Sequence, residues 1–293
     1  MGQKKKKHKK KNRFISFFLT VGIIVCIGVI GFAGYKLITT WMEYREGDEE
    51  YAELRGYTEE TADLSGSSEE QAEEEEELVP DPEASSATPE SEEIDLDDMR
   101  TNRKPPINVD WKSLISINED IVGWLYIGAL DVSYPVVHGE DDDYYLHRTF
   151  ERTDNFAGSI FVEAQNSGDF RDPNTIVYGH NMLNGSMFGS LSNLTNGQEP
   201  KYKENPWFWI MTPNGNYRYR MFSIHVTGVS SDVYTIFKGT DSKFLEWCRD
   251  MSEASSVELE KQEFDLHSKI VTLSTCTGDS GTRYVVQGLA IKD

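Results

Sequence analysis

The chain has 293 residues and a formal net charge of −21, and this charge is divided into blocks along the sequence. Residues 1–13 carry +8, residues 43–104 carry 24 acidic and five basic side chains, and residues 105–293 carry a net −11. Because contacts to nucleic-acid phosphates need clustered positive charge, we expect no nucleic-acid binding by the acidic C-terminal part.

Residues 14–35 form an uncharged stretch that is rich in Ile, Val, Phe and Gly. As a helix rising 1.5 Å per residue, this stretch would cover about 30 Å, the thickness of a bilayer core. It is longer than the apolar core of a signal peptide and lacks a clear small-x-small cleavage site, which favours a transmembrane signal anchor over a cleaved leader. The basic residues 1–13 then predict a cytoplasmic tail and a single pass through the cell membrane, with the remaining chain outside the cell.

Residues 36–104 are predicted to form an acidic, disordered stalk. The run Glu73–Glu77 and the Ser, Pro and Glu residues after it offer too little apolar surface to offset the entropy of ordering. A calcium-binding tract is the alternative, but the acidic residues lack the spacing of a defined calcium loop. We therefore expect a spacer, and we place the folded domain at residues 105–293, which suffice for one sizeable core.

The fold class predicted for residues 105–293 is mainly β. Eight short segments are rich in β-branched and aromatic residues and are mostly separated by Gly, Asn, Asp or Pro, which is typical of a closed or nearly closed barrel with short helices. The turn Pro213-Asn214-Gly215-Asn216 predicts a hairpin between two of them. The expected strands are Val122–Ile127, Val132–Val137, Ser159–Val162, Thr175–Tyr178, Trp207–Thr212, Tyr217–Val229, Lys269–Thr275 and Arg283–Ile291.

Two helices are expected beside the strands. Residues 111–115 have helical apolar spacing, and Asp110 is a plausible N-cap. Residues 241–251 place Phe244, Leu245, Cys248 and Met251 on one face of an amphipathic helix. Cys248 is therefore predicted to be a core thiol.

Cys276 is the candidate nucleophile among the three cysteines, Cys26, Cys248 and Cys276. It follows the strand 269–275 and precedes a turn of Gly, Asp and Ser, so its thiol is expected to be accessible. An inert thiol at a strand end and a Cys248–Cys276 disulfide are the alternatives.

Two possible partners of this thiol also lie at strand ends. His180 follows one strand in the sequence Tyr178-Gly179-His180-Asn181, although a lone histidine is more often structural. Arg283 opens the last strand and would face Cys276 if the final two strands pair as an antiparallel hairpin, although a solvated surface arginine is the ordinary case. The remaining histidines, His8, His138, His147, His225 and His267, are weaker candidates.

The three residues together suit acyl-transfer chemistry. A thiol with a pKa of about 8.5 is mostly protonated at neutral pH, and nearby positive charge raises its thiolate fraction. An imidazole can protonate a departing amine, and a guanidinium can stabilise a developing oxyanion. No cofactor is predicted, because the sequence lacks metal-ligand spacings of the Cys-x-x-Cys type and a glycine-rich phosphate loop.

The segments Thr272–Cys276, Tyr178–Asn181 and Arg283–Val286 together resemble the sortase family of cysteine transpeptidases, and Ile121–Ile127 resembles its class B. The resemblance covers roughly residues 108–293 and implies an eight-stranded sortase-type β-barrel. It implies that Cys276 is the nucleophile, His180 the acid and base, and Arg283 the clamp for the oxyanion or substrate. It also implies substrate contacts for Ser274 and Thr275.

The resemblance further implies a reaction. The enzyme would cut a C-terminal sorting signal of a secreted protein, of the Asn-Pro-x-Thr-x or x-Pro-x-Thr-Gly type, between Thr and Gly. The acyl group would pass through a Cys276 thioester to an amine of a peptidoglycan precursor or a pilin. The alternatives are a wall-associated cysteine peptidase that hydrolyses the thioester and a tethered adhesin with a vestigial site. The order His180 before Cys276 favours a sortase over papain-like enzymes, in which the cysteine comes first.

Overall fold

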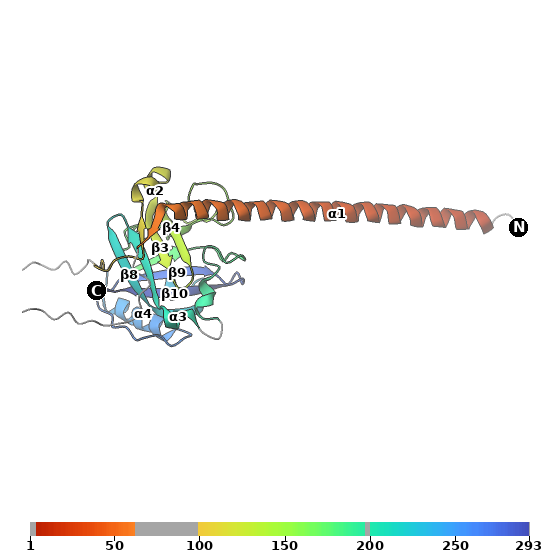
Figure 1. The fold of residues 1–293 in the computed structure, drawn as a ribbon. Helices are drawn as coiled ribbons and strands as arrows, with labels where there is room; N and C mark the ends of the chain where they lie inside the picture. Colours follow the sequence, from red (N-terminus) through yellow and green to blue (C-terminus); the bar gives the residue numbers. More distant parts are fainter. Residues whose placement is uncertain (1–3, 62–98, 197–199, 293) are drawn as a thin grey trace, which may run out of the picture. The chain divides into compact units, whose positions relative to one another are not determined.

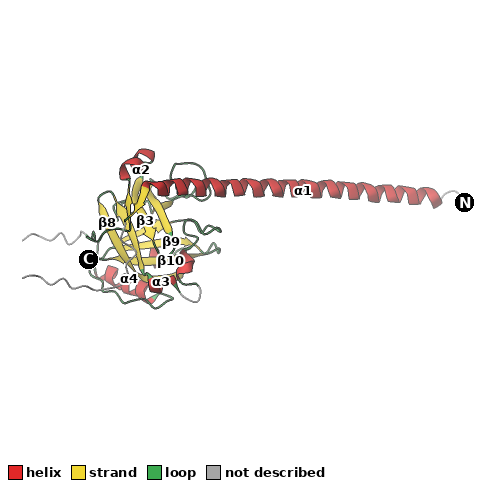
Figure 2. Ribbon diagram, in the orientation of Figure 1, coloured by secondary structure: helices red, strands yellow, loops and turns green. Residues whose placement is uncertain are grey.

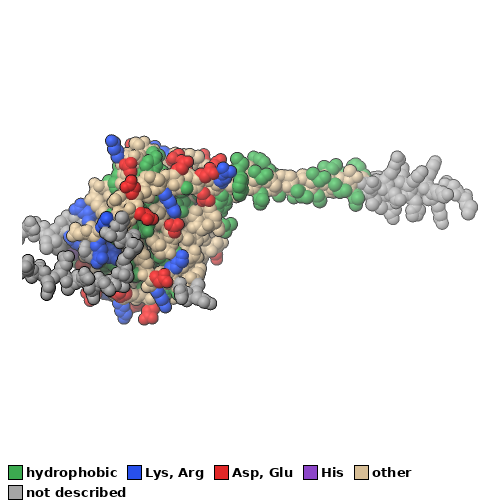
Figure 3. Space-filling model, viewed as in Figure 1, with side chains coloured by type: hydrophobic (Ala, Val, Ile, Leu, Met, Phe, Trp, Pro, Cys, Tyr) green, Lys and Arg blue, Asp and Glu red, His purple; other side chains and the backbone are tan. Residues whose placement is uncertain are grey.

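The computed structural model describes residues 4–61, 99–196 and 200–292, and the chain divides into two compact units, Met1–Glu50 and Tyr51–Asp293. Helix α1 (Lys4–Leu54) builds the first unit as far as Glu50, and its last four residues belong to the second. Its apolar side chains from Phe17 to Tyr35 are exposed, and Figure 3 shows them along the helix. Among the described residues, this is one helix long and apolar enough to cross a membrane, with a mean hydropathy of 2.5 in its most apolar window.

The structure corrects the predicted stalk and the boundary at residue 105. Residues 36–54 continue helix α1, η1 (Arg55–Tyr57) follows, and β1 (Thr58–Glu60) pairs antiparallel with β2 (Ile107–Val109). Tyr51 is buried, and its hydroxyl donates a hydrogen bond of 2.7 Å to the carbonyl oxygen of Gly158. Disorder is therefore a wrong prediction for residues 36–61: residues 36–54 are helical, and from Tyr51 onward burial and backbone pairing outweigh the acidic local composition. The rest of the predicted stalk, residues 62–98, lies outside the described residues.

Eight strands of the second unit close into a barrel in the order β10-β8-β7-β3-β4-β5-β6-β9 (Figures 1 and 2), which confirms the predicted fold class. The pairs β4–β5 and β6–β9 are parallel, and the other neighbours in the barrel are antiparallel. Trp124, Phe208 and Tyr219 are fully buried in its core. The strands are β3 (Ile121–Ile127), β4 (Val132–His138), β5 (Ile160–Val162), β6 (Asn174–Tyr178), β7 (Trp207–Thr212), β8 (Gly215–Gly228), β9 (Ile270–Cys276) and β10 (Thr282–Ala290).

Short helices flank the barrel. The first, α2 (Trp111–Ile117), is capped as expected, because the Asp110 side chain accepts a hydrogen bond from the Ser113 amide. Between β6 and β9 lie η2 (Leu191–Leu194), α3 (Lys201–Glu204), η3 (Asp232–Tyr234) and α4 (Ser242–Glu253).

Helix α4 covers one outer face of the barrel. It buries Phe244, Trp247, Cys248 and Met251 in a cluster that includes strand residues Phe222, Ile270, Val285 and Leu289. The predicted amphipathic helix and its buried thiol are thus confirmed, while Leu245 is only partly buried. The packing of α4 fixes the segment before it, η3, which borders the candidate site.

Candidate active site

The parallel pairing of β6 and β9 brings the ends of both strands to the same end of the barrel. Tyr178 at the end of β6 lies opposite Ser274, two residues before Cys276. The next amide, that of Gly179, donates to the carbonyl oxygen of Ser274 at 3.3 Å. Because the segments that continue β6 and β9 stay in register, His180 leaves the sheet beside Cys276.

Two side-chain hydrogen bonds continue this alignment beyond the strands. The Thr275 hydroxyl donates to the carbonyl oxygen of Gly179 at 2.7 Å. On the other side of the histidine, the Asn181 amide group donates to the carbonyl oxygen of Cys276 at 2.8 Å. The residues before and after His180 are therefore both tied to the end of β9.

Arg283 faces Cys276 across the mouth of the β9–β10 hairpin, as the sequence predicted. Its guanidinium donates to the carbonyl oxygens of Ser280 and Thr282, at 3.1 and 2.9 Å, and so lies over the turn that joins the strands. The planar group is held by bonds from one nitrogen, Nη1.

The imidazole of His180 is half-buried and held by one contact. Its Nε2 lies 2.8 Å from the carbonyl oxygen of Leu146. A carbonyl oxygen only accepts hydrogen bonds, so this contact places a hydrogen on Nε2 and leaves Nδ1 as the nitrogen that exchanges a proton. The backbone amide of Phe188 also donates to the carbonyl oxygen of His180, which fixes the start of the following loop.

The two cysteines of the barrel unit differ sharply. Cys276 is exposed and free, whereas Cys248 is free and fully buried. Burial raises the pKa of the Cys248 thiol to about 12. The structure therefore contains no Cys248–Cys276 disulfide, and Cys276 is the thiol that a substrate can reach.

Ser274 and Thr275 are placed differently from the expectation. Both are buried, with exposed fractions of 1% and 5%. The Ser274 hydroxyl shares a hydrogen bond of 2.8 Å with the hydroxyl of Tyr234, and that of Thr275 is bonded to Gly179. Their hydroxyl groups therefore position the neighbouring elements of the site, and a substrate contact of these two residues stays a prediction.

Tyr234 is a site residue that the sequence reasoning missed. Its ring stacks on that of Tyr178 with the centroids 6.4 Å apart. Burial raises the pKa of the Tyr234 hydroxyl, and the nearby Cys276 raises it further, whereas the hydrogen bond to Ser274 and the charge of Arg283 lower it. Because Arg283 and Cys276 both act on this hydroxyl, Tyr234 lies within electrostatic range of the hairpin mouth. Residues 232–234 have no strand or helix periodicity, and only the aromatic residue itself could have drawn attention to this segment.

Two side chains hold the Tyr234 segment against the barrel. The Trp247 indole of α4 donates to the carbonyl oxygen of Asp232 at 2.7 Å. The side-chain amide of Asn174, fully buried at the start of β6, donates to the carbonyl oxygens of Val233 and Thr235, each at 3.1 Å. Helix α4 therefore supports the wall of the site through η3.

Comparisons with known proteins agree with this geometry. The family model that matches, described as the sortase domain, covers residues 125–290. Sortase B of Listeria monocytogenes is 32% identical over 198 residues, covering 66% of this chain and 78% of the relative. Sortase B of Staphylococcus aureus is 24% identical over 278 residues, covering 94% of this chain and 97% of the relative.

Solved structures give the same result for the fold. The crystal structure of sortase B from Bacillus anthracis in complex with AAEK1 has a TM-score of 0.63 and 26% identity, covering 86% of this chain and all of that chain. The Staphylococcus aureus sortase B–substrate complex has a TM-score of 0.57 and 28% identity, covering 62% of this chain and 84% of that chain.

Proposed function

Because the chain belongs to the sortase family, as a member of its class B, we propose that it cleaves a sorting signal near the C-terminus of secreted proteins and passes the acyl group to an amine. This proposal rests on one observation, that the ends of β6 and β9 meet the start of β10. At this point Cys276 lies opposite Arg283, and hydrogen bonds hold residues 179–181 beside it. The exposed thiol gives a peptide access to this point.

The proposed first step forms a thioester. The Cys276 thiolate attacks the carbonyl carbon of the Thr–Gly bond, and the Arg283 guanidinium stabilises the negative charge that develops on the oxygen. The protonated imidazole of His180 donates its Nδ1 proton to the departing amine as the C–N bond breaks. The acyl group is then bound to sulfur, and His180 is neutral.

The second step reverses these roles. An acceptor amine attacks the thioester carbonyl, His180 takes the proton from that amine, and the Cys276 thiolate leaves. The acceptor is an amine of a peptidoglycan precursor or a pilin, and the signal is of the Asn-Pro-x-Thr-x or x-Pro-x-Thr-Gly type. Water in place of the amine would give the alternative activity, a wall-associated cysteine peptidase.

The test uses the full chain in detergent with labelled peptides of both signal types, each with and without triglycine as the amine. We expect one signal type to be cut and the label to be recovered joined to triglycine. Release of a free carboxylate alone, at the same rate with and without triglycine, would favour the peptidase. No cleavage of either signal by the folded chain would contradict the proposal.

We also propose that α1 anchors the enzyme with residues 1–13 in the cytoplasm and the barrel unit outside the cell. The exposed apolar side chains of α1 and the basic tail support this orientation. Protease added to intact cells without their wall is then expected to release the barrel unit. Protection of the barrel unit until the membrane is permeabilised would contradict this orientation.

A further inference from the structure

The carbonyl oxygen that holds the imidazole of His180 belongs to the loop between β4 and β5. This oxygen is that of Leu146, which lies 2.8 Å from Nε2. Gly158, near the other end of the loop, lies close to it, and a Cβ atom on this glycine would collide with the Leu146 carbonyl oxygen. The neighbouring carbonyl oxygen, that of Tyr145, accepts a hydrogen bond of 2.9 Å from the Ser159 amide. The position of the oxygen that orients His180 therefore depends on how Gly158 and Ser159 are held.

The hydroxyl of Tyr51 holds this loop from the last turn of α1. It donates a hydrogen bond to the carbonyl oxygen of Gly158 at 2.7 Å and accepts one from the Phe150 amide at 3.3 Å. It also lies 3.4 Å from the hydroxyl oxygen of Ser159, which itself donates to the carbonyl oxygen of Arg148 at 2.8 Å. Tyr51 thus ties together the two sides of the loop whose carbonyl oxygen orients the imidazole.

A second set of contacts leads from Tyr51 to the segment that begins with His180. The ring of Tyr51 packs edge-on against that of Tyr134 in β4, with the ring centroids 5.4 Å apart. The Tyr134 hydroxyl accepts a hydrogen bond of 3.1 Å from the Met187 amide. Met187 forms an antiparallel bridge with Asn181, the residue after the histidine. One tyrosine side chain therefore contacts the supports of both the histidine and the carbonyl oxygen to which it bonds.

We propose that Tyr51 is a positioning residue for His180, a role that rests on the proposed function for its effect on rate. A neutral imidazole carries its hydrogen on one nitrogen, and the bond to Leu146 keeps that hydrogen on Nε2. If this carbonyl oxygen shifts, both nitrogens compete for the hydrogen. An imidazole with its hydrogen on Nδ1 cannot take the proton of the acceptor amine there. Because Tyr51 is buried in the last turn of α1, the helix that carries the apolar span also supports the histidine.

The kinetic test is Tyr51→Phe in the full chain in detergent, with the sorting-signal peptide that the wild type cuts and triglycine as the amine. This variant keeps the ring against Tyr134 but leaves the Gly158 carbonyl oxygen and the Phe150 amide without this partner, so the loop relaxes. We expect kcat to fall by a factor of about 10 to 100, because the proton carrier is misplaced. KM is expected to stay unchanged, because the hydroxyl acts on the histidine and not on the bound peptide.

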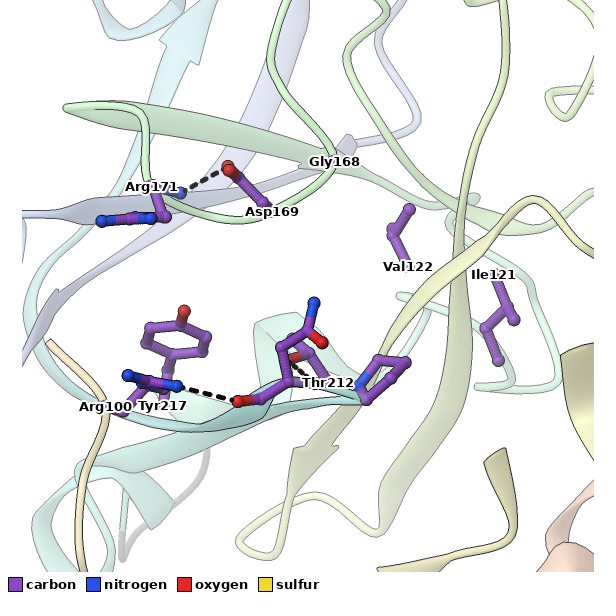
Figure 4. Close-up of a pocket in the computed structure, with 10 residues that line it drawn as sticks. Arg100, Ile121, Val122, Gly168, Asp169, Arg171, Thr212 and Tyr217 are labelled. Carbon is purple, nitrogen blue, oxygen red and sulfur yellow. Dashed lines mark hydrogen bonds between the residues drawn. The ribbon is translucent and has the colours of Figure 1, made fainter. Parts of the chain in front are cut away.

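Thr212 provides the matched control. It lines the pocket shown in Figure 4, beside the turn that begins β8, whereas β8 ends opposite the start of β10, near Cys276. Like that of Tyr51, its buried hydroxyl accepts a hydrogen bond from a backbone amide, that of Asn214 at 3.2 Å, and donates one to a carbonyl oxygen, that of Gly215 at 2.8 Å. Thr212→Val removes the same two kinds of bond at the other end of the barrel, and we expect it to leave kcat unchanged.

The tautomer of His180 is a second readout, which needs no substrate and which a role in stability alone would not change. The full chain is labelled with ¹⁵N-histidine, and the signals of His180 are identified by their loss in His180→Gln. Under conditions where the imidazole is neutral, we expect the wild type and Thr212→Val to carry the hydrogen on Nε2. Tyr51→Phe is expected to show a mixture of both tautomers.

Wild-type kcat or an unchanged tautomer in folded Tyr51→Phe, or an equal loss of kcat in Thr212→Val, would overturn the proposal. Circular dichroism checks the folding of each variant. If Tyr51→Phe does not fold, Tyr134→Phe takes its place, because it loses the bond to the Met187 amide and is expected to change kcat and tautomer in the same direction. A wild type that cuts no sorting signal would contradict the proposed function, while the tautomer would still decide the role of Tyr51.

Discussion

The β9–β10 hairpin has one outer face with two different ends. Near one end, the paired residues Ile270 and Leu289 pack under α4 in the cluster that contains the fully buried thiol of Cys248. At the other end, the same face carries Cys276 and Arg283, where the thiol is exposed. The two thiols thus border the same hairpin, but that of Cys248, on α4, is buried in an apolar cluster, whereas that of Cys276, at the end of β9, lies opposite Arg283.

The reactivity that we propose for Cys276 therefore follows from its surroundings rather than from its residue type. Burial raises the pKa of Cys248 to about 12, so this thiol stays neutral and unreactive at physiological pH. Cys276 has no such cover, and Arg283 lies opposite it. We therefore propose a chemical role for Cys276 and a packing role for Cys248.

Replacing each thiol in turn tests this comparison, and it is expected to give the largest effect. Cys276→Ala removes the nucleophile, so cleavage of a sorting-signal peptide is expected to fall to background. Cys248→Ala is expected to keep cleavage near the wild-type rate but to lower the free energy of unfolding by about 1 kcal/mol, because it leaves a small cavity under α4. Peptide cleavage and denaturant unfolding of the full chain measure both effects.

Removing the proton donor is expected to be next in size. In His180→Ala, the thiol still reacts with an alkylating reagent, but nothing protonates the departing amine. General acid catalysis typically contributes about 10²–10⁴-fold, so kcat for peptide cleavage is expected to fall by a factor in that range. A His267→Ala variant, which changes a histidine outside the site, is the control. A fall of the same size in that control would refute the assigned role.

Arg283→Lys sharpens the comparison, because it keeps the positive charge beside Cys276. Lysine lacks the planar fork, so a group aimed at an oxyanion loses its alignment. Loss of one such donor typically costs about 10²–10³ in rate, and we expect a fall of that size in kcat/KM. Near-wild-type cleavage would reduce Arg283 to a general positive charge near the thiolate. Arg249→Lys on α4 is the matched control.

The smallest expected effect is on the pH dependence of stability. The Cys248 thiol ionises near its ordinary pKa of 9.0 when unfolded and only near about 12 when folded. Above pH 9 the unfolded state therefore loses a proton that the folded state keeps, so stability is lost as pH rises from 9 towards 12. The fall in unfolding free energy over this range is expected to be steeper for wild type than for Cys248→Ala. Parallel curves would contradict the burial of this thiol.

The barrel and the hairpin mouth were predictable because their signals are local. Alternating β-branched residues mark the strands, and the turn after Cys276 places Arg283 opposite it. The helix with Cys248 was predictable from its 3.6-residue period.

What was missed depends on contacts between residues far apart in the sequence. Tyr51 belongs to the folded unit because it bonds to Gly158, 107 residues away, and the acidic residues around it hide this. The burial of Ser274 depends on Tyr234, which arrives on a segment without periodicity. Neither contact leaves a pattern in its own segment.

The most direct test of the central claim is to map the acyl group on the enzyme. The full chain is mixed with a sorting-signal peptide without an amine acceptor, quenched in acid, digested and analysed by mass spectrometry. The account predicts that the peptide's acyl part is attached to Cys276 through a bond that hydroxylamine cleaves, while Cys248 remains unmodified. An acyl group on Cys248, or peptide cleavage by a folded Cys276→Ala variant, would contradict it.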